Sequence, residues 1–351
     1  MSCTRSPAAL SRTVEPIGIT ALQLTLRELR ALLADDEVTE LCINRPGEVF
    51  VESGTGWRRE ALPFADLGWC NRLAKLVANA THQRIDECSP LLSGWLPGGE
   101  RVQIVVPPAT STGTVAIAIR RPSRQSWSVA QLCERGALRV ARAAAASPDA
   151  TMQQLQQLAA DHDYEPFLRL AVRSRLNILI SGPTGSGKTT WTRALIQEIP
   201  AHERLVTIED TAELVLHRHP NAVQLYYSKD GQGLARVAPK QLLDCSLRLR
   251  PDRILLAELR GEEAFDYLRC VNSGHPGSIT SVHAGSAELA LEQLVLLVKQ
   301  SASGRALSRG DIRHLLHQLV DVIVQCGFDG RRRYVREVWF APGRRLESGT
   351  G

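Results

Sequence analysis

The feature that most constrains this 351-residue chain is the segment from Asn177 to Glu198, which has the sequence NILISGPTGSGKTTWTRALIQE. Its aliphatic run, Ile178 to Ile180, predicts a short buried strand. A loop of small residues follows, and Lys188 and Thr189 then begin a predicted helix that ends before Pro200. The loop matches the pattern G-x-x-x-x-G-K-[ST] in the strand–loop–helix setting that this pattern needs. The segment therefore predicts a site for the phosphates of a nucleoside triphosphate.

The chemistry of such a loop depends on its backbone as much as on its side chains. Successive N–H groups and the helix N-terminus carry partial positive charge. We expect Lys188 to contact the β- and γ-phosphates of ATP, and the Thr189 hydroxyl to ligate Mg²⁺. The alternative is a glycine-rich turn that precedes a lysine by chance, and the strand and helix around the pattern count against it. The residues expected to bind the nucleotide are Gly182, Pro183, Thr184, Gly185, Ser186, Gly187, Lys188, Thr189 and Thr190.

Composition limits the classes of protein to which the chain can belong. A hydrophobic content of 44% with 23% charged residues is ordinary for a globular protein, and the length allows two domains. The formal net charge is +5, but no basic run interleaved with aromatic residues indicates a nucleic-acid track, so direct nucleic-acid binding stays open. A modest positive charge is compatible with an anionic membrane surface.

No apolar run approaches the ~18–20 residues needed to cross a bilayer. The N-terminus lacks the apolar core of a signal peptide, and residues 1–20 are predicted to form a flexible tail. The eight cysteines include no C-x-x-C pair, which argues against a zinc site or a disulfide framework. A cytosolic chain with reduced thiols is the expectation.

Residues 21–122 are predicted to form a small α+β domain, and residues 123–163 an interdomain linker that carries short helices. The predicted elements of the first domain are a helix over 21–33, strands over 38–43 and 48–51, a helix over 65–80, a loop over 90–99, and strands over 101–106 and 114–119.

Residues 164–351 are predicted to form a second domain, in which helices and strands alternate. The predicted elements after the phosphate loop are strands over 205–208 and 223–226, a helix over 240–249, a strand over 254–257, helices over 287–299 and 309–318, and a hairpin of 319–325 with 334–340. This alternation indicates an α/β fold with a mostly parallel sheet and helices on both faces.

A phosphate loop is normally completed by an acidic residue at the end of a neighbouring buried strand. Glu258 ends the run Ile254 to Ala257, where the carboxyl ends of strands meet the nucleotide, whereas Asp252 lies at the opposite end. We expect Glu258 to hold the Mg²⁺ shell or to orient and deprotonate the attacking water. An isolated glutamate at such a position is more often a surface charge, but the phosphate loop upstream favours the catalytic role.

Two further segments carry candidate residues. Glu209 follows the strand predicted over 205–208 and is expected to meet the active-site water and metal, while Asp210 is a candidate cap for the next turn. His283 ends a predicted strand in the segment GHPGSITSVHA. A histidine there is often structural, but near a γ-phosphate it can report hydrolysis.

Four segments, SGPTGSGKTT, TIEDTAEL, LRPDRILLAELRG and SGHPGSITSVHA, resemble in order the Walker A, Asp-box, Walker B and His-box motifs of secretion ATPases. The segments VTELCINRPGEVFVE and LPGGERVQIVVPP resemble the N-terminal domain of the traffic ATPases of bacterial type IV secretion and conjugation systems. The resemblance covers roughly residues 20–340. The paired C-x-x-C zinc insertion usual in type II secretion ATPases is absent from the sequence.

The resemblance implies a RecA-like P-loop ATPase domain preceded by a smaller α+β domain, in a hexameric ring with ATP between the two domains of each protomer. It also implies that arginines of the first domain reach the phosphates, and the matching positions are Arg101 and Arg120. Arg121 beside Arg120 leaves that assignment open by one residue, and an exposed strand edge is the alternative location for either. Through these arginines the first domain would act as a lid, which would close on ATP and reopen after hydrolysis.

The expected role is that of a motor at the inner face of a bacterial inner membrane, which contacts other cytoplasmic and membrane components of a secretion channel. Three alternatives are a type IV pilus or type II secretion motor, a nucleic-acid translocating ATPase, and an assembly protein that uses nucleotide only as a clamp. DNA, a toxin and effector proteins are all possible cargoes.

Overall fold

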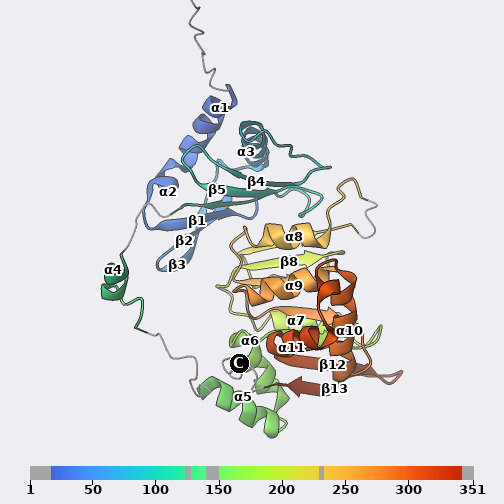
Figure 1. Cartoon of the computed structure of the whole chain (residues 1–351). Helices are drawn as coiled ribbons and strands as arrows, with labels where there is room; N and C mark the ends of the chain where they lie inside the picture. Colours follow the sequence, from blue (N-terminus) through green and yellow to red (C-terminus); the bar gives the residue numbers. More distant parts are fainter. Residues whose placement is uncertain (1–16, 123–127, 140–149, 229–232, 342–351) are drawn as a thin grey trace, which may run out of the picture.

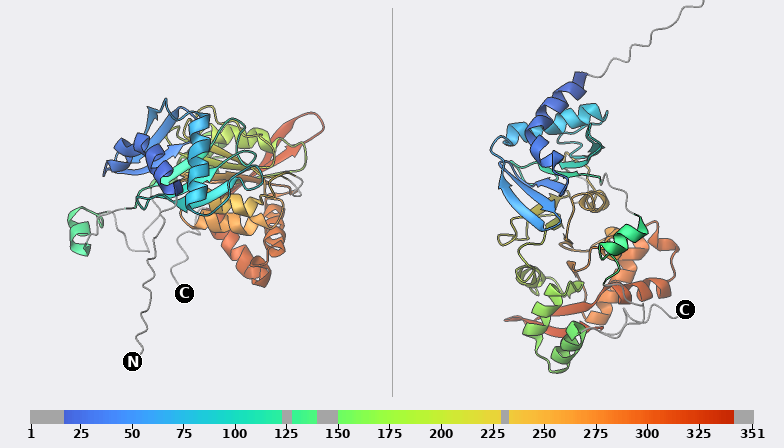
Figure 2. Two further views of the ribbon diagram at one scale, coloured as in Figure 1. Left: turned by 90° about the horizontal axis from the view of Figure 1, so that it is seen from above. Right: turned by 90° about the vertical axis from the view of Figure 1, so that its left-hand side faces the viewer.

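The computed structural model describes residues 17–122, 128–139, 150–228 and 233–341. Figure 1 shows a first domain, in blue and teal, stacked above a second domain, in green to red. The two views of Figure 2 show the same stacking from above and from the side. Of the tail predicted for residues 1–20, residues 1–16 lie outside the described part, and residues 17–20 belong to the first helix.

The first domain is a six-stranded antiparallel sheet in the order β3-β2-β1-β6-β5-β4, with helices packed on one face. Its elements are α1 (Ile17–Leu26), η1 (Arg27–Leu29), α2 (Arg30–Ala34), β1 (Val38–Ile43), β2 (Glu48–Ser53), β3 (Gly56–Ala61), α3 (Leu67–Ala80), β4 (Leu91–Trp95), β5 (Arg101–Val105) and β6 (Ala116–Arg120).

Three features of this domain differ from the predicted elements. The first helix begins at Ile17 rather than at residue 21 and is interrupted by η1. Strand β3 was not predicted, and β4 lies within the predicted loop over 90–99. Both missed strands are the edges of the sheet, and β3, GWRREA, is mostly exposed, so neither carries the run of buried apolar residues that marks a central strand.

The second domain has a sheet with helical layers on both faces, which confirms the predicted α/β fold. Strands β10, β8 and β9 are parallel; β11, β7 and β12 are also parallel, and β13 pairs antiparallel with β12. Strands β10 and β11 lie beside each other, which joins the two sets. The elements are α5 (Ala150–Ala160), α6 (Tyr164–Arg173), β7 (Ile178–Ser181), α7 (Lys188–Ile196), β8 (Leu205–Glu209), β9 (Ala222–Tyr226), α8 (Pro239–Ser246), β10 (Arg253–Leu256), α9 (Glu263–Asn272), β11 (Ile279–Val282), α10 (Ala287–Gln300), η3 (Gly304–Ala306), α11 (Arg309–Leu319), β12 (Val322–Phe328) and β13 (Arg333–Phe340).

Alternation along the strands divides the core between the two helical layers. In β7, Leu179 joins the cluster under α8, α9, α10 and α11, whereas Ile178 and Ile180 join the cluster under α5, α6 and α7. Residues 150–160 were predicted as linker, yet Leu155 of α5 is fully buried against this second cluster. The other described helix of the predicted linker is α4 (Val129–Glu134), and residues 123–127 and 140–149 lie outside the described part.

The two domains share a packed boundary. In β6, Ala116 and Ala118 join the core cluster of the second domain, while Ile117 and Ile119 face the core of the first. Polar contacts surround this apolar centre: Arg204 Nη1 donates to Asn44 Oδ1 (2.7 Å), and Thr110 Oγ1 donates to the carbonyl of Gln224 (3.0 Å). At the periphery, Arg250 pairs with Glu52 of the first domain.

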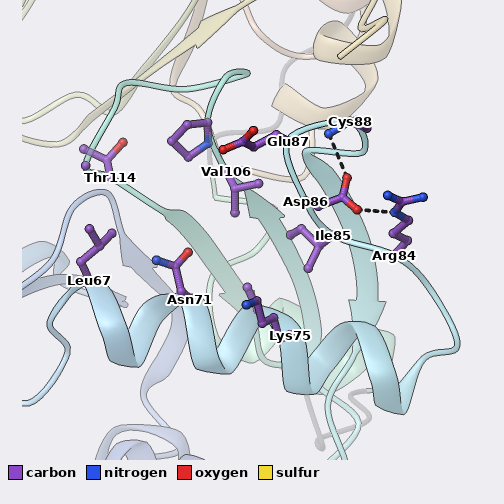
Figure 3. Close-up of a pocket in the computed structure, with 13 residues that line it drawn as sticks. Leu67, Asn71, Lys75, Arg84, Ile85, Asp86, Glu87, Cys88, Val106 and Thr114 are labelled. Atoms are coloured by element: carbon purple, nitrogen blue, oxygen red, sulfur yellow. Dashed lines mark hydrogen bonds and ion pairs between the residues drawn. The ribbon is translucent and has the colours of Figure 1, made fainter. Parts of the chain in front are cut away.

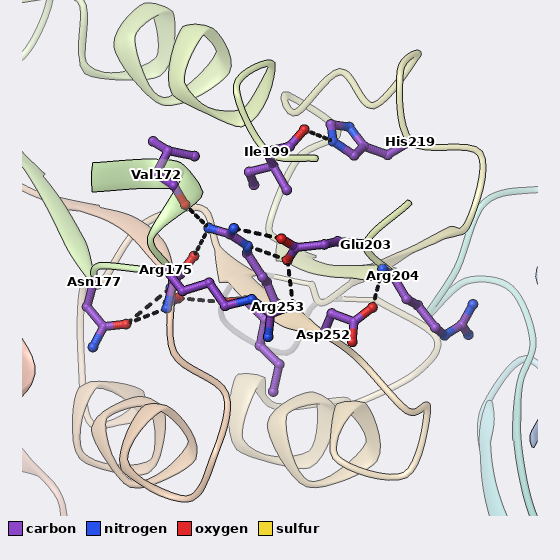
Figure 4. Close-up of polar contacts among 12 residues, drawn as sticks. Val172, Arg175, Asn177, Ile199, Glu203, Arg204, His219, Asp252 and Arg253 are labelled. Carbon is purple, nitrogen blue, oxygen red and sulfur yellow. Dashed lines mark hydrogen bonds and ion pairs between the residues drawn. The ribbon is translucent and has the colours of Figure 1, made fainter. Parts of the chain in front are cut away.

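A buried ion pair fixes the strands of the second domain at their amino ends (Figure 4). The Arg253 side chain is fully buried, and its Nε and Nη2 donate to Glu203 over 2.7 and 3.0 Å. Its Nη1 donates to the carbonyls of Val172 and Gly277, which lie before β7 and β11. Although burial opposes the change, hydrogen bonding and charge from Arg253 lower the pKa of Glu203. One guanidinium therefore joins three segments that enter the sheet.

Candidate functional site

The loop between β7 and α7 has a shape that only small residues allow. Gly187, the residue before the helix, has φ +95°, a left-handed conformation that favours glycine. A Cβ on Gly182 would lie 2.8 Å from the carbonyl oxygen of Cys326 and 2.5 Å from Ser186 Oγ. The Ser186 hydroxyl donates to the carbonyl of Pro183 (2.8 Å), which closes the loop on itself.

The inner side of this loop fits an anion. Within the described part of the chain, the N–H groups of Gly185, Gly187, Lys188 and Thr189 have no backbone carbonyl as a partner. Four neighbouring unpaired donors at the N-terminus of a helix, together with the helix dipole, match the requirements of a phosphate group.

Lys188 points across the loop toward the end of the neighbouring strand β11. Its side chain is 9% exposed, and Nζ donates to the carbonyl of Gly182 (3.1 Å) and to Nδ1 of His283 (3.1 Å). Burial lowers the pKa of Lys188, and the nearby Glu258 carboxylate partly offsets that effect. A phosphate that replaced the Gly182 carbonyl and the His283 ring would bring a negative charge into direct contact with this ammonium group.

Glu258 and His283, both predicted from the sequence, meet beside Lys188. His283 Nε2 lies 2.7 Å from Glu258 Oε1. The other carboxylate oxygen accepts a hydrogen bond from Arg260 Nε (2.6 Å), and Arg260 Nη1 donates to Asp210 (2.7 Å). A continuous series of polar contacts therefore connects Lys188 to the segment after β8.

Arg260 was missed at the sequence level, although it stands two residues after Glu258 in the quoted segment LAELRG. Its place is fixed by Glu263 Oε1, which accepts hydrogen bonds from the N–H groups of Arg260 and Gly261 (2.7 and 2.8 Å). The signal available in the sequence was an arginine directly before Gly261 and a glutamate, Glu263, shortly after it.

The structure does not bring Glu209 together with the phosphate loop. Its side chain is 0% exposed, and its Oε2 accepts hydrogen bonds from the N–H groups of Glu213 and Leu214, each at 2.8 Å. Its Oε1 accepts from Thr207 Oγ1 (2.8 Å) and Gln224 Nε2 (3.2 Å). The carboxylate that faces the loop is instead Glu213, whose Oε2 accepts a hydrogen bond from Thr189 Oγ1 (3.1 Å).

Arg101 and Arg120 also lie away from Lys188 in the same chain. They face each other across β5 and β6 and line a cavity of about 780 Å³ together with Arg248 and Arg250 of the second domain. That cavity lies where the chain enters β10, at the amino ends of the parallel strands, whereas Lys188 lies beyond the carboxyl end of β7. In this arrangement, the two arginines and the phosphate loop therefore lie at opposite ends of the parallel strands.

The choice between Arg120 and Arg121 has a clear structural basis. The Arg121 side chain is 7% exposed and bonds Asp36 (3.0 Å) and the carbonyl of Val38 (3.1 Å), so it serves the first domain's own structure. Arg120 is exposed, and its Nε lies 3.7 Å from Glu40. Burial raises the pKa of Glu40 to about 7, and the Arg120 charge opposes that rise. Arg120 is therefore the side chain able to turn toward a ligand.

A second cavity, of about 650 Å³, lies within the first domain between α3 and the loop over 84–88 (Figure 3). Its charged side chains are partly paired with one another, because Arg84 bonds Asp86. The Asp86 carboxylate also accepts a hydrogen bond from the N–H of Cys88 (2.8 Å).

In the ranges that the structure describes, no three His, Cys, Asp or Glu side chains gather as a metal-binding cluster. Mg²⁺ does not require one, because it keeps several waters and takes phosphate oxygens along with one or two protein ligands. The oxygen atoms beside the loop, those of Thr189 and Glu213 with Glu258 further along, are of the chemical type that Mg²⁺ prefers. No described helix has the length and apolar character to span a membrane.

Comparisons with known proteins find relatives that match the chain over most of its length. Residues 26–327 match the model of the family described as "Type II/IV secretion system protein". The chain is 45% identical over 334 residues to the type IV secretion system protein VirB11 of Bartonella quintana, and the match covers 92% of this chain and 94% of that protein. It is 41% identical over 325 residues to the type IV secretion system protein PtlH of Bordetella pertussis, and covers 91% and 94% of the two chains.

The fold is also similar to that of a solved structure. The VirB11 ATPase from the type IV secretion system of Brucella suis, crystallised in complex with sulphate, superposes with a TM-score of 0.89 and 43% sequence identity. The superposition covers 94% of this chain and 97% of the other. The similarity therefore extends over both domains.

Proposed function

Because the chain belongs to the type II/IV secretion system protein family, we propose that it is the ATP-hydrolysing motor of a type IV secretion or conjugation system. The observation that carries the proposal is the arrangement at the phosphate loop. Lys188 Nζ lies 3.1 Å from His283, and His283 lies 2.7 Å from Glu258. Beside them, the loop presents N–H groups without backbone partners.

The loop binds the triphosphate, and Lys188 leaves the carbonyl of Gly182 and the imidazole of His283 to pair with the β- and γ-phosphates. Glu258 then orients a water and accepts its proton as the water oxygen bonds the γ-phosphorus. The bond from that phosphorus to the β–γ bridging oxygen breaks, which yields ADP and phosphate. Arg260 holds the Glu258 carboxylate during this step. His283, released by Lys188, is placed to follow the change at the γ-phosphate.

Thr189 and Glu213, with Glu258, are the residues proposed to hold Mg²⁺ together with the phosphates. When bound, Mg²⁺ neutralises negative charge on the β- and γ-phosphates. Glu209, expected from the sequence to contact the metal, is proposed instead to shape the segment that presents Glu213.

The positions of Arg101 and Arg120 favour a homo-oligomer. These arginines reach a phosphate in one of two ways: the first domain separates from the second, or the phosphate belongs to another copy of the chain. The first way breaks the buried hydrogen bond of Arg204 with Asn44 and the peripheral ion pair of Arg250 with Glu52. The second preserves them, so we infer an assembly of identical copies, with six subunits as the family resemblance implies.

The chain acts at the cytoplasmic face of the inner membrane, bound peripherally, with other components of the secretion channel as partners. ATP binding and hydrolysis drive domain motions that support export or assembly of the channel. Export of a reporter substrate that stops in cells carrying Lys188→Ala, while the protein level is unchanged, would support this role.

The direct test is phosphate release by the purified chain with ATP and Mg²⁺. The Lys188→Ala variant should lose turnover and keep its fold, because the lysine contributes charge rather than packing. Lys240→Ala is the matched control, since Lys240 lies on α8 and pairs with Asp266 at the long distance of 3.8 Å. Unchanged turnover in Lys188→Ala would overturn the assignment of the loop.

A further inference from the structure

The tip of the β12–β13 hairpin lies against the phosphate loop. Arg333, the first residue of β13, is paired in register with Phe328, the last residue of β12. Arg333 Nε donates to the carbonyl of Gly185 (2.8 Å), and its Cδ would lie 3.1 Å from a Cβ built on Gly187. Its guanidinium carbon lies 5.9 Å from the centre of the Phe328 ring. The hairpin tip therefore touches the outer side of the loop through one arginine and carries an aromatic ring beside it.

The order of the strands gives the triphosphate a direction. Strand β11 lies on one side of β7, and strands β12 and β13 lie on the other. Lys188 points toward His283, which follows β11, so the γ-phosphate end of the ligand is on that side. A nucleoside triphosphate is a linear chain, and its other end leaves the loop on the side of β12 and β13. That is where Phe328 and Arg333 lie.

We propose that Phe328 and Arg333 form the nucleoside side of the ATP site. This inference rests on the proposed function and adds the residues that contact the base. The Phe328 ring is 47% exposed, and the Arg333 guanidinium carbon lies 5.9 Å from its centre, so a purine base can stack on the ring with a cation close by. Stacking of this kind is tolerant of base identity, so the pair contributes affinity for nucleotides rather than selection of adenine.

Arg333 has a second role that Phe328 does not share. Its hydrogen bond holds the Gly185 carbonyl on the outer side of the loop, and the neighbouring N–H groups are left for the phosphates. Arg333 is thus a positioning residue for the phosphate groups as well as the cation beside the Phe328 ring. Loss of Phe328 should affect ligands that have a base, whereas loss of Arg333 should affect every ligand that has phosphates.

The test measures binding of ATP, ADP and inorganic tripolyphosphate to the full chain by calorimetry. Phe328→Ala should bind ATP and ADP about tenfold more weakly, and tripolyphosphate within about twofold of the wild type. Phe328→Trp should restore nucleotide affinity. Arg333→Ala should weaken all three ligands, and Arg336→Ala, which changes an exposed arginine three residues along β13, should weaken none.

Wild-type ATP affinity in Phe328→Ala would overturn the inference, as would an equal loss for tripolyphosphate and ATP. Tripolyphosphate binding unchanged in Arg333→Ala would overturn the positioning role. A wild-type chain that bound neither ATP nor tripolyphosphate would instead overturn the proposed function, and the inference with it. Thermal unfolding of each variant shows whether a loss of binding comes from a loss of fold.

Discussion

The buried carboxylate of Glu209 holds the N–H group of Glu213 at 2.8 Å, so that one acidic residue positions another. Glu213 in turn accepts a hydrogen bond from Thr189, the second residue of the helix that follows the phosphate loop. The two glutamates therefore have separable roles. Glu209 determines the shape of a loop, and Glu213 presents oxygen atoms to the site.

Substitution should separate the two roles. Glu213→Ala should leave the melting temperature unchanged and raise the Mg²⁺ concentration needed for ATP turnover, since Glu213 is exposed and is not part of a core. Glu209→Gln should destabilise the fold by about 1–3 kcal/mol, because an amide N–H₂ then faces backbone donors in a buried position. Thermal unfolding and Mg²⁺ titration of ATPase activity measure the two effects. A normal Mg²⁺ requirement in Glu213→Ala would argue against its role at the metal.

Glu258→Gln should retain ATP but hydrolyse it about 10²–10⁴-fold more slowly, because the amide keeps the shape of the side chain and cannot accept a proton. Single-turnover phosphate release, combined with nucleotide binding, measures both properties. Glu262→Gln is the matched control, since Glu262 is exposed and its side chain does not cap α9. Turnover near the wild-type rate in Glu258→Gln would remove the residue from the catalytic role.

The ion pair of Glu203 with Arg253 should make stability depend on pH. The pKa of Glu203 is lower in the folded chain than the ordinary carboxyl value of 4.5. Its contribution is therefore fully present above pH 4.5 and is lost as the pH falls through the lower folded pKa. Glu203→Gln should lower the free energy of unfolding at neutral pH by about 3–5 kcal/mol, because Arg253 is left buried without its partner, and should flatten the acid dependence.

Chemical denaturation between pH 3 and 7 tests this prediction. Glu60→Gln, which removes an exposed partner of Arg58, serves as the control and should change stability by less than ~1 kcal/mol. An acid dependence in Glu203→Gln equal to that of the wild type would show that other carboxylates dominate.

The phosphate loop could be predicted because its constraints are local: glycines where side chains do not fit, a lysine at the start of a helix, and a buried strand before it. Glu258 and His283 were also predicted, since both follow central strands whose carboxyl ends meet. Glu213 was not predicted as a site residue, because the segment TIEDTAEL does not indicate which of its acidic side chains is buried and which faces the phosphate loop. Glu209 is the buried one, and its burial depends on the packing of β8 between β9 and β10.

Arg101 and Arg120 illustrate a different limit of prediction from sequence. Their neighbourhood in the first domain follows from the register of β5 and β6, but their distance from Lys188 depends on how one domain docks on the other. No local pattern reports that docking, which rests on contacts between residues as far apart in sequence as Asn44 and Arg204. Phe328 and Arg333 were not predicted for a similar reason. They lie beside the phosphate loop only because β12 is the neighbour of β7 in the folded sheet.

The packing of the first domain on the second predicts that mixtures of two inactive variants regain ATPase activity. Lys188→Ala removes the phosphate loop's charge, and the double variant Arg101→Ala with Arg120→Ala removes both arginines. If the arginines of one copy serve the loop of another, each variant alone should be inactive, and a mixture should regain activity at about a quarter of its sites when the copies assort at random. A mixture of Lys188→Ala with the triple variant of all three positions is the control, and it should regain none.

Recovery is expected because the first domain stays docked in each copy through the contacts of Asn44 with Arg204 and of Glu52 with Arg250. An intact loop then meets intact arginines only at the boundary between two different chains. Phosphate release by the mixture, measured together with its size in solution, decides the question. A mixture that forms oligomers and stays inactive would mean that each chain's arginines act on its own loop, which requires the first domain to separate from the second during the ATPase cycle.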